Sequence, residues 1–168
     1  APAVREIVLE EIFEPGEIDP DWVEQRIDEE FARKLEVERA WPAVTDCDKL
    51  DRAFDELNET GIIALQNAGF TQDEGIEDVT AEYEELGGED SLVEGYCFYH
   101  GQDLERAVDG EGLLLTFGDI QGDDARGVEI GARIVEVLHR HGLAVEWTGT
   151  IDQRIELPEI EWRRRYVE

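Results

Sequence analysis

Residues 61–88, GIIALQNAGFTQDEGIEDVTAEYEELGG, decide how this chain folds. Their four consecutive apolar residues, 62–65, are typical of a buried strand. Thr71, followed three positions later by Glu74, predicts a capping box that starts a helix. An apolar stripe at helical spacing continues that helix until two glycines end it: Ile76, Val79, Tyr83 and Leu86. The stretch therefore predicts a strand followed by a helix.

The same signals extend outward in both directions. They predict further helices at 45–57, 102–108 and 128–141, and further strands at 96–99, 113–117, 143–147 and 154–157. This order fits the α+β class, as a two-layer split β-α-β (ferredoxin-like) sandwich with helices on one face and added N-terminal helices. A three-layer α/β fold with a mostly parallel sheet is the alternative. The connection 100–112 is short for a parallel crossover, which favours the sandwich.

Two segments with different patterns suggest the domain organisation. Residues 1–44 are predicted to form an N-terminal helical arm, with one helix near residues 4–12 and another starting at Asp19-Pro20. Residues 45–168 are predicted to form the α+β domain.

The charge of the chain restricts its partners. Its 44 Asp and Glu residues against 15 Lys and Arg give a formal charge of −29, and residues 53–105 hold acids without any Lys or Arg. Such a surface repels nucleic acids and anionic lipids, so neither is an expected partner, and it attracts basic proteins. A solvated surface that favours solubility explains the acidity equally well. The three arginines at 163–165 are expected to pair with acids of this chain or of a second copy.

Other features of the sequence bear on the cellular location of the protein. The apolar runs are too short to cross a membrane, and the combination of two Cys residues with no apolar leader predicts a cytoplasmic location. Nothing in the sequence indicates the oligomeric state.

No metal or cofactor is predicted. Cys97 and His100 have a spacing found in zinc sites, but the sequence supplies no second pair of ligands. Residues three apart on a strand point to opposite faces, so these two do not form a nucleophile and base without a bend. Both Cys47 and Cys97 are expected to be buried and unpaired.

Polar residues follow the first two strands of the predicted sheet. Gln66 and Asn67 follow the first, and His100, Gln102 and Asp103 follow the second. Such positions line binding sites, but they also cap turns and helices. Asp103 lies one turn after His100, where a carboxylate can orient an imidazole. If the first two strands are parallel neighbours, Asn67 and His100 share one edge of the sheet.

Four blocks carry a resemblance to a known family: TDCDKLDRAFDEL (45–57), GIIALQNAGFTQ (61–72), GYCFYHGQDLERAV (95–108) and GLLLTFGD (112–119). Together they resemble a bacterial family of uncharacterised proteins, domain of unknown function 6891. The resemblance covers residues 41–165 and spares the N-terminal arm. It implies a bacterial cytoplasmic protein, with no reaction or catalytic residue to carry over.

The sequence favours a non-enzymatic interaction or regulatory protein that binds a basic protein partner. One version is an immunity-type inhibitor whose acidic surface covers a cationic nuclease. The alternative is a small-ligand or enzymatic site at the strand ends around Asn67 and His100. The candidate residues of either site are the same: Gln66, Asn67, His100, Gln102 and Asp103.

Overall fold

A computed structural model describes residue 7 and residues 19–165, which fall into two compact units. Of the described residues, the first unit holds residues 7, 19–43 and 165, and the second holds residues 44–164. Within the first unit, helix α2 (Pro20–Glu38) begins as the sequence predicts, because the Asp19 side chain accepts a hydrogen bond from the backbone N–H of Asp21. The helix expected near residues 4–12 lies outside the described residues, apart from residue 7.

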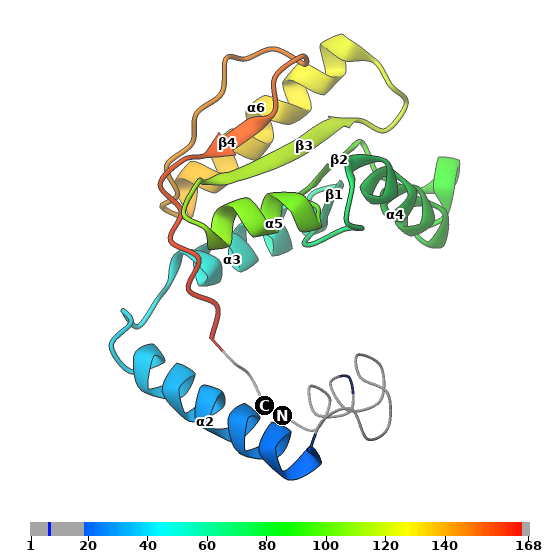
Figure 1. The fold of residues 1–168 in the computed structure, drawn as a ribbon. Helices are drawn as coiled ribbons and strands as arrows, with labels where there is room; N and C mark the ends of the chain where they lie inside the picture. The colour runs from blue at the N-terminus through cyan, green and yellow to red at the C-terminus, as the bar shows by residue number, and fades with distance from the viewer. Residues whose placement is uncertain (1–6, 8–18, 166–168) are drawn as a thin grey trace. The chain divides into compact units, whose positions relative to one another are not determined.

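The second unit is built on a four-stranded mixed sheet (Figure 1). Its strands lie in the order β1 (Ile62–Leu65), β2 (Gly95–Phe98), β3 (Leu113–Asp119) and β4 (Ile155–Leu157). β1 and β2 are parallel, whereas β2 with β3 and β3 with β4 are antiparallel.

Helices cover both faces of this sheet. Side chains alternate along β1, so Ile62 and Ala64 join one apolar cluster and Ile63 joins another. The first cluster holds the buried faces of α3 (Asp46–Glu59) and α6 (Asp124–Arg140). The second cluster holds α4 (Gln72–Glu85), and the short α5 (Gly101–Val108) connects β2 to β3.

The predicted α+β class is confirmed, but two details differ from the split β-α-β arrangement. That arrangement leaves another strand between the first two, whereas β1 and β2 here pair directly. The 14 residues of α4 supply the crossover that parallel neighbours need. Helices also lie on both faces rather than on one. The alternative of a mostly parallel sheet is wrong, since only β1 and β2 pair in parallel.

The strand predicted at residues 143–147 is not formed. Only Glu146 makes a bridge, exchanging both backbone hydrogen bonds with Glu156 at 2.8 and 3.0 Å. The indole N–H of Trp147 is shared between the carbonyls of Thr150 and Gln153, each at 3.0 Å. These bonds turn the chain away from the sheet directly after the bridge, although the edge strand predicted at 154–157 is confirmed as β4.

Close packing fixes α4 on the sheet. A Cβ atom on Gly75 would lie 2.2 Å from the ring of Phe98, so only glycine permits this approach of helix and strand. On the opposite face, Cys47 and Cys97 are buried and unpaired, as predicted. Within the described part of the chain, no helix combines the length and the apolar character needed to cross a membrane.

Candidate functional site

The parallel pairing of β1 and β2 brings the two sets of strand-end residues to one edge of the sheet. The turn after β1 runs beside the end of β2, with hydrogen bonds from Ala68 N–H to the Tyr99 carbonyl at 2.9 Å and from Gly101 N–H to the Gly69 carbonyl at 3.0 Å. Alternation along the chain nevertheless separates the side chains, because Gln66 contacts Tyr99 and α3 while His100 points to the other face. The candidates therefore form separate groups.

Asn67 and Gln66 line a surface hollow between the end of β1 and α4. This hollow, called the acidic groove below, has a volume of about 290 Å³. Its lining combines two amides, three carboxylates and an apolar floor: Leu65, Gln66, Asn67, Ala68, Asp78, Ala81, Glu82 and Glu85. His100, Gln102 and Asp103 are not part of it.

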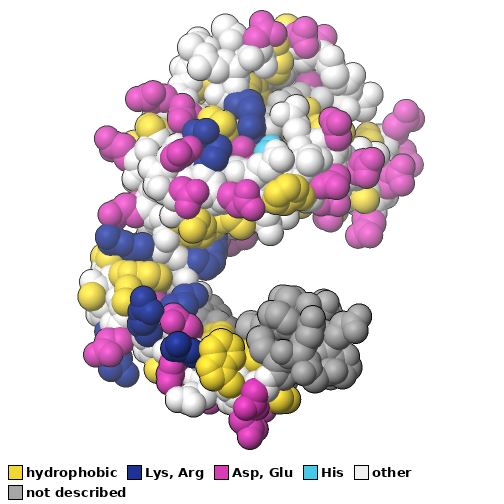
Figure 2. All heavy atoms as spheres, in the orientation of Figure 1, with side chains coloured by type: hydrophobic (Ala, Val, Ile, Leu, Met, Phe, Trp, Pro, Cys, Tyr) yellow, Lys and Arg dark blue, Asp and Glu magenta, His cyan; other side chains and the backbone are white. Residues whose placement is uncertain are grey.

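The ion pairs described in the second unit do not involve the acids of α4. Among the described residues, no Lys or Arg forms an ion pair with an α4 carboxylate, although every Lys and Arg of this unit except Arg52 pairs with an acid. Figure 2 shows Asp and Glu side chains gathered over α4, without Lys or Arg among them on the face in view. The negative charge of this region is therefore left for solvent or for a partner.

Asn67 itself has a local structural reason to be present. It adopts the left-handed backbone conformation, with φ of 53°, and Gly69 two residues later does the same at 57°. Asn tolerates this conformation better than most residues. The turn at Asn67 forms one wall of the acidic groove.

His100 and Asp103 do meet, in a buried polar cluster with Arg154. The Asp103 Oδ2 atom accepts from the backbone N–H of His100 at 3.2 Å and lies 3.1 Å from the ring Nε2. The guanidinium of Arg154 also binds Oδ2 and reaches the Leu114 carbonyl at 3.3 Å. Asp103 therefore caps the start of α5, and the His100 side chain is buried, at 5% exposure.

The state of the imidazole follows from this burial. Burial lowers the pKa of His100 below its usual range, and Arg154 acts in the same direction while Asp103 opposes both. The ring is therefore neutral near pH 7, with its Nε2–H directed at Asp103 and no hydrogen bond to Nδ1. Gln102 does not contribute to the cluster; its side chain is exposed, and its N–H donates to the Phe70 carbonyl at 3.2 Å.

A third group of residues, which the sequence did not predict, surrounds Arg164. It consists of Asp51, Gln66 and Trp162 and is called the arginine seat below. The guanidinium Nη1 lies 2.8 and 2.7 Å from the two carboxylate oxygens of Asp51, and Nη2 lies 2.8 Å from Oε1 of Gln66. Its Cζ lies 5.5 Å from the ring centre of Trp162, which packs edge-on against Tyr99. The expectation that the terminal arginines pair with the chain's own acids is thus confirmed for Arg164, although no sequence signal pointed to Asp51.

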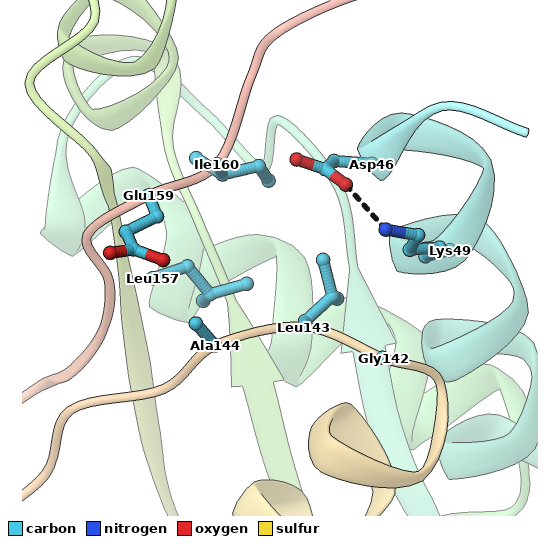
Figure 3. Close-up of a pocket in the computed structure, with 8 residues that line it drawn as sticks. All are labelled: Asp46, Lys49, Gly142, Leu143, Ala144, Leu157, Glu159 and Ile160. Atoms are coloured by element: carbon cyan, nitrogen blue, oxygen red, sulfur yellow. Dashed lines mark hydrogen bonds and ion pairs between the residues drawn. The ribbon is translucent and has the colours of Figure 1, made fainter. Parts of the chain in front are cut away.

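Another hollow, of about 200 Å³, lies between the start of α3 and the segments at 142–144 and 157–160 (Figure 3). Its Lys49 is bound to Asp46 at 2.8 Å, and Asp46 also accepts from the backbone N–H of Glu161 at 3.0 Å. The carboxylate of Glu159 points away from this pair in Figure 3. The cation of this hollow is therefore already neutralised by Asp46.

Comparisons with known proteins give one match. The chain matches the family described as a domain of unknown function, DUF6891, over residues 2–166. The match includes the N-terminal segment, so the expectation that the resemblance spares it is wrong. No curated protein and no solved structure matches. Among the described residues, no group of acidic, His and Cys side chains is placed to hold a metal ion.

Proposed function

We propose, from the premise that this chain belongs to the DUF6891 family, that it is a non-enzymatic binding protein whose acidic groove docks a basic protein partner. The observation that carries the proposal is the contrast between α4 and the rest of the second unit. Every Lys or Arg of this unit that forms an ion pair does so with an acid outside α4, whereas the α4 carboxylates have no such partner among the described residues and three of them line a hollow. A surface that served only solubility has no need of such a division.

The acidic groove suits a Lys or Arg side chain. The aliphatic part of such a side chain can lie on the floor formed by Leu65, Ala68 and Ala81, as long cationic side chains commonly do. Its charged end then faces the three rim carboxylates. The remaining acids of α4 and of the turn after it accelerate the encounter with a basic surface and reject anionic partners.

Three apolar side chains in the segments before and after α4 are also exposed. Phe70 and Leu86 are each 52% exposed, and Leu92 is 92% exposed. An interface gains affinity from apolar and aromatic contacts at its centre, and charge mainly adds specificity and rate. A basic protein that inserts a cation into the groove would also meet Leu86, which directly follows Glu85 at the end of α4.

The setting that we propose is the bacterial cytoplasm, which suits two free, buried cysteines. An immunity-type role, in which the acidic face covers a cationic nuclease, is one form of the same activity. The polar cluster of His100 fits an enzymatic role less well, because Asp103 is 2% exposed and is occupied by Arg154. That cluster holds α5 against the sheet.

Binding of a model cation tests the proposal. A fluorescein-labelled peptide of alternating Lys and Gly would be titrated with the protein and with the triple variant Asp78→Asn, Glu82→Gln, Glu85→Gln. We expect the variant to bind about tenfold more weakly, since a few central contacts dominate an interface. The matched control removes the same charge from exposed acids outside the groove: Glu105→Gln, Asp109→Asn and Glu129→Gln. Equal weakening in both triple variants would show a diffuse charge effect and contradict a defined groove.

A further inference from the structure

We infer that the arginine seat is a guanidinium-binding site, and that an arginine of the basic partner enters it by displacing Arg164. The chain's own arginine is then a resident occupant that competes with the partner. The inference deepens the proposed function and rests on it for the source of the incoming arginine. The seat itself is argued from its own geometry.

The acceptors of the seat match a guanidinium rather than an ammonium group. Asp51 and Gln66 together present three oxygen atoms to two different nitrogens of Arg164, all at 2.7–2.8 Å. A planar guanidinium directs several N–H groups in fixed directions, whereas an ammonium is a compact point charge. The ring of Trp162, 5.5 Å from Cζ, adds a cation–π contact that favours Arg over Lys.

The seat is also held in place by contacts that do not involve Arg164. The Gln66 side chain donates from Nε2 to Oδ1 of Asp51 at 2.7 Å, which fixes which end of the amide faces the cation. The hydroxyl of Tyr99 donates to Oε1 of Gln66 at 3.1 Å. Because Asp51 lies on α3 and Gln66 directly follows β1, regular elements position both acceptors. The acceptor set would therefore persist after Arg164 leaves.

The segment that carries Arg164, unlike the elements that carry Asp51 and precede Gln66, has no regular secondary structure. Residues 158–164 belong to no helix or strand, and Arg164 is the last residue of the second unit. Besides the seat, the contacts of this segment include the buried side chain of Ile160, the Trp162 ring against Tyr99, the bond from Glu161 N–H to Asp46 and a backbone hydrogen bond of Arg163 with Cys47. Exchange of one guanidinium for another leaves the charges of the seat paired.

Gln66 connects the seat to the acidic groove. The same side chain that holds Arg164 also lines the groove. A partner that places one cation in the groove therefore brings a neighbouring arginine close to the seat. Arg163 offers a contrast, since its guanidinium pairs with the exposed Glu161, two residues away, at 2.9 Å.

Chemical rescue tests the seat without any partner. We expect Arg164→Ala to melt at a lower temperature than the native protein, and millimolar ethylguanidinium to restore much of the loss. Ethylammonium at the same concentration should not, and neither compound should change the melting of Arg163→Ala. Asp51→Asn, added to Arg164→Ala, should abolish the rescue. Equal effects of the two compounds, or rescue that survives Asp51→Asn, would overturn the inference.

Peptide binding then tests competition by Arg164. A labelled peptide of alternating Arg and Gly should bind Arg164→Ala about tenfold more tightly than Arg163→Ala, if the native arginine fills the seat roughly nine-tenths of the time. The Lys peptide should not distinguish the two variants, because the ammonium gains little from the seat. Equal affinity of both variants for the Arg peptide would show that Arg164 is only structural.

The two proposals fail in different ways. If the two triple variants bind the Lys peptide equally well but ethylguanidinium still rescues Arg164→Ala, the docking groove is contradicted. The guanidinium site is then still supported. If Arg164→Ala does not melt cooperatively, Arg164→Gln retains a polar side chain of similar length and serves in both measurements. In that variant too, ethylguanidinium should raise the melting temperature more than ethylammonium does.

Discussion

The side-chain amide of Asn58 pairs with the backbone of Ala64 as a neighbouring strand would. Its Oδ1 atom accepts from the Ala64 N–H at 2.8 Å, and its Nδ2 donates to the Ala64 carbonyl at 3.0 Å. β1 is an edge strand, and unpaired backbone groups on an edge invite pairing with other chains. The end of α3 thus closes the middle of this edge with a single side chain.

Replacement of Asn58 should therefore weaken the fold and expose the edge. We expect Asn58→Ala to lower the free energy of unfolding by about 1–2 kcal/mol, because two backbone groups lose their partners. Urea denaturation measures this loss, and light scattering after size-exclusion chromatography measures any new self-association. Glu59→Ala, at the exposed neighbouring position, is the control and should change neither quantity by much. An unchanged midpoint for Asn58→Ala would show that water replaces the amide without penalty.

The buried imidazole should make stability depend on pH. Since the folded-state pKa of His100 is lowered from its unfolded value of about 6.5, the unfolded chain binds the proton more readily. The contribution of the neutral ring is fully present above the unfolded pKa and is lost as the pH falls below it, toward the folded pKa. His100→Gln removes this titration, so the stability difference between native protein and variant should shrink between pH 7.5 and pH 5.5.

Comparison with the variant is needed because it cancels the pH dependence that the rest of the chain contributes. A difference that grows on acidification would mean that Asp103 stabilises the charged ring more strongly than burial destabilises it. Urea midpoints of both proteins at each pH decide between these outcomes.

The charge of the chain should make its stability depend on salt. At −29, the folded state repels itself, and salt screens this repulsion with a Debye length of about 10 Å at 0.1 M. We expect the melting temperature to rise between low salt and roughly 0.5 M NaCl at pH 7.5. The rise should be smaller in the triple variant of the acidic groove, which removes acids that no cation of the described chain neutralises. A flat curve for the native protein would contradict the self-repulsion.

Both cysteines should be chemically inert in the folded protein. Burial strongly raises the pKa of the Cys97 thiol, and burial is also the main cause of the raised pKa of Cys47. Iodoacetamide should therefore label neither residue appreciably until urea unfolds the chain, as mass spectrometry would show. Labelling of the native protein as fast as that of a free thiol would reveal access that the structure does not provide.

Local signals account for much of what the sequence predicts correctly. The capping box of Thr45 with Asp48 and that of Thr71 with Glu74 both start helices as expected. These signals act within one turn of chain, so neighbouring residues suffice to detect them. The alternation of Leu143, Val145 and Trp147 misleads because it reports burial, and a segment can pack against a core without pairing as a strand.

The candidate site was less accessible to prediction, for a different reason. Its contacts join residues far apart in the chain, and charge alone does not specify partners. Arg164 lies 113 positions from Asp51, and Arg154 lies 51 positions from Asp103. The spacing of His100 and Asp103 permitted a contact without showing one, and only the folded structure shows that the two side chains meet and are buried.

The helix starts described above imply that two kinds of acid in this chain tolerate substitution differently. Asp48, Glu74, Asp103 and Asp123 each accept a backbone hydrogen bond at the beginning of a helix. Drift at these positions should be confined to other side chains that can accept such a bond. Exposed acids such as Glu77 and Glu84 contribute only their negative charge. An acid can therefore be lost at one such position and gained at a neighbouring one, as long as the net charge of the surface is kept. Relatives should thus vary in where their surface acids lie and agree in how their helices begin.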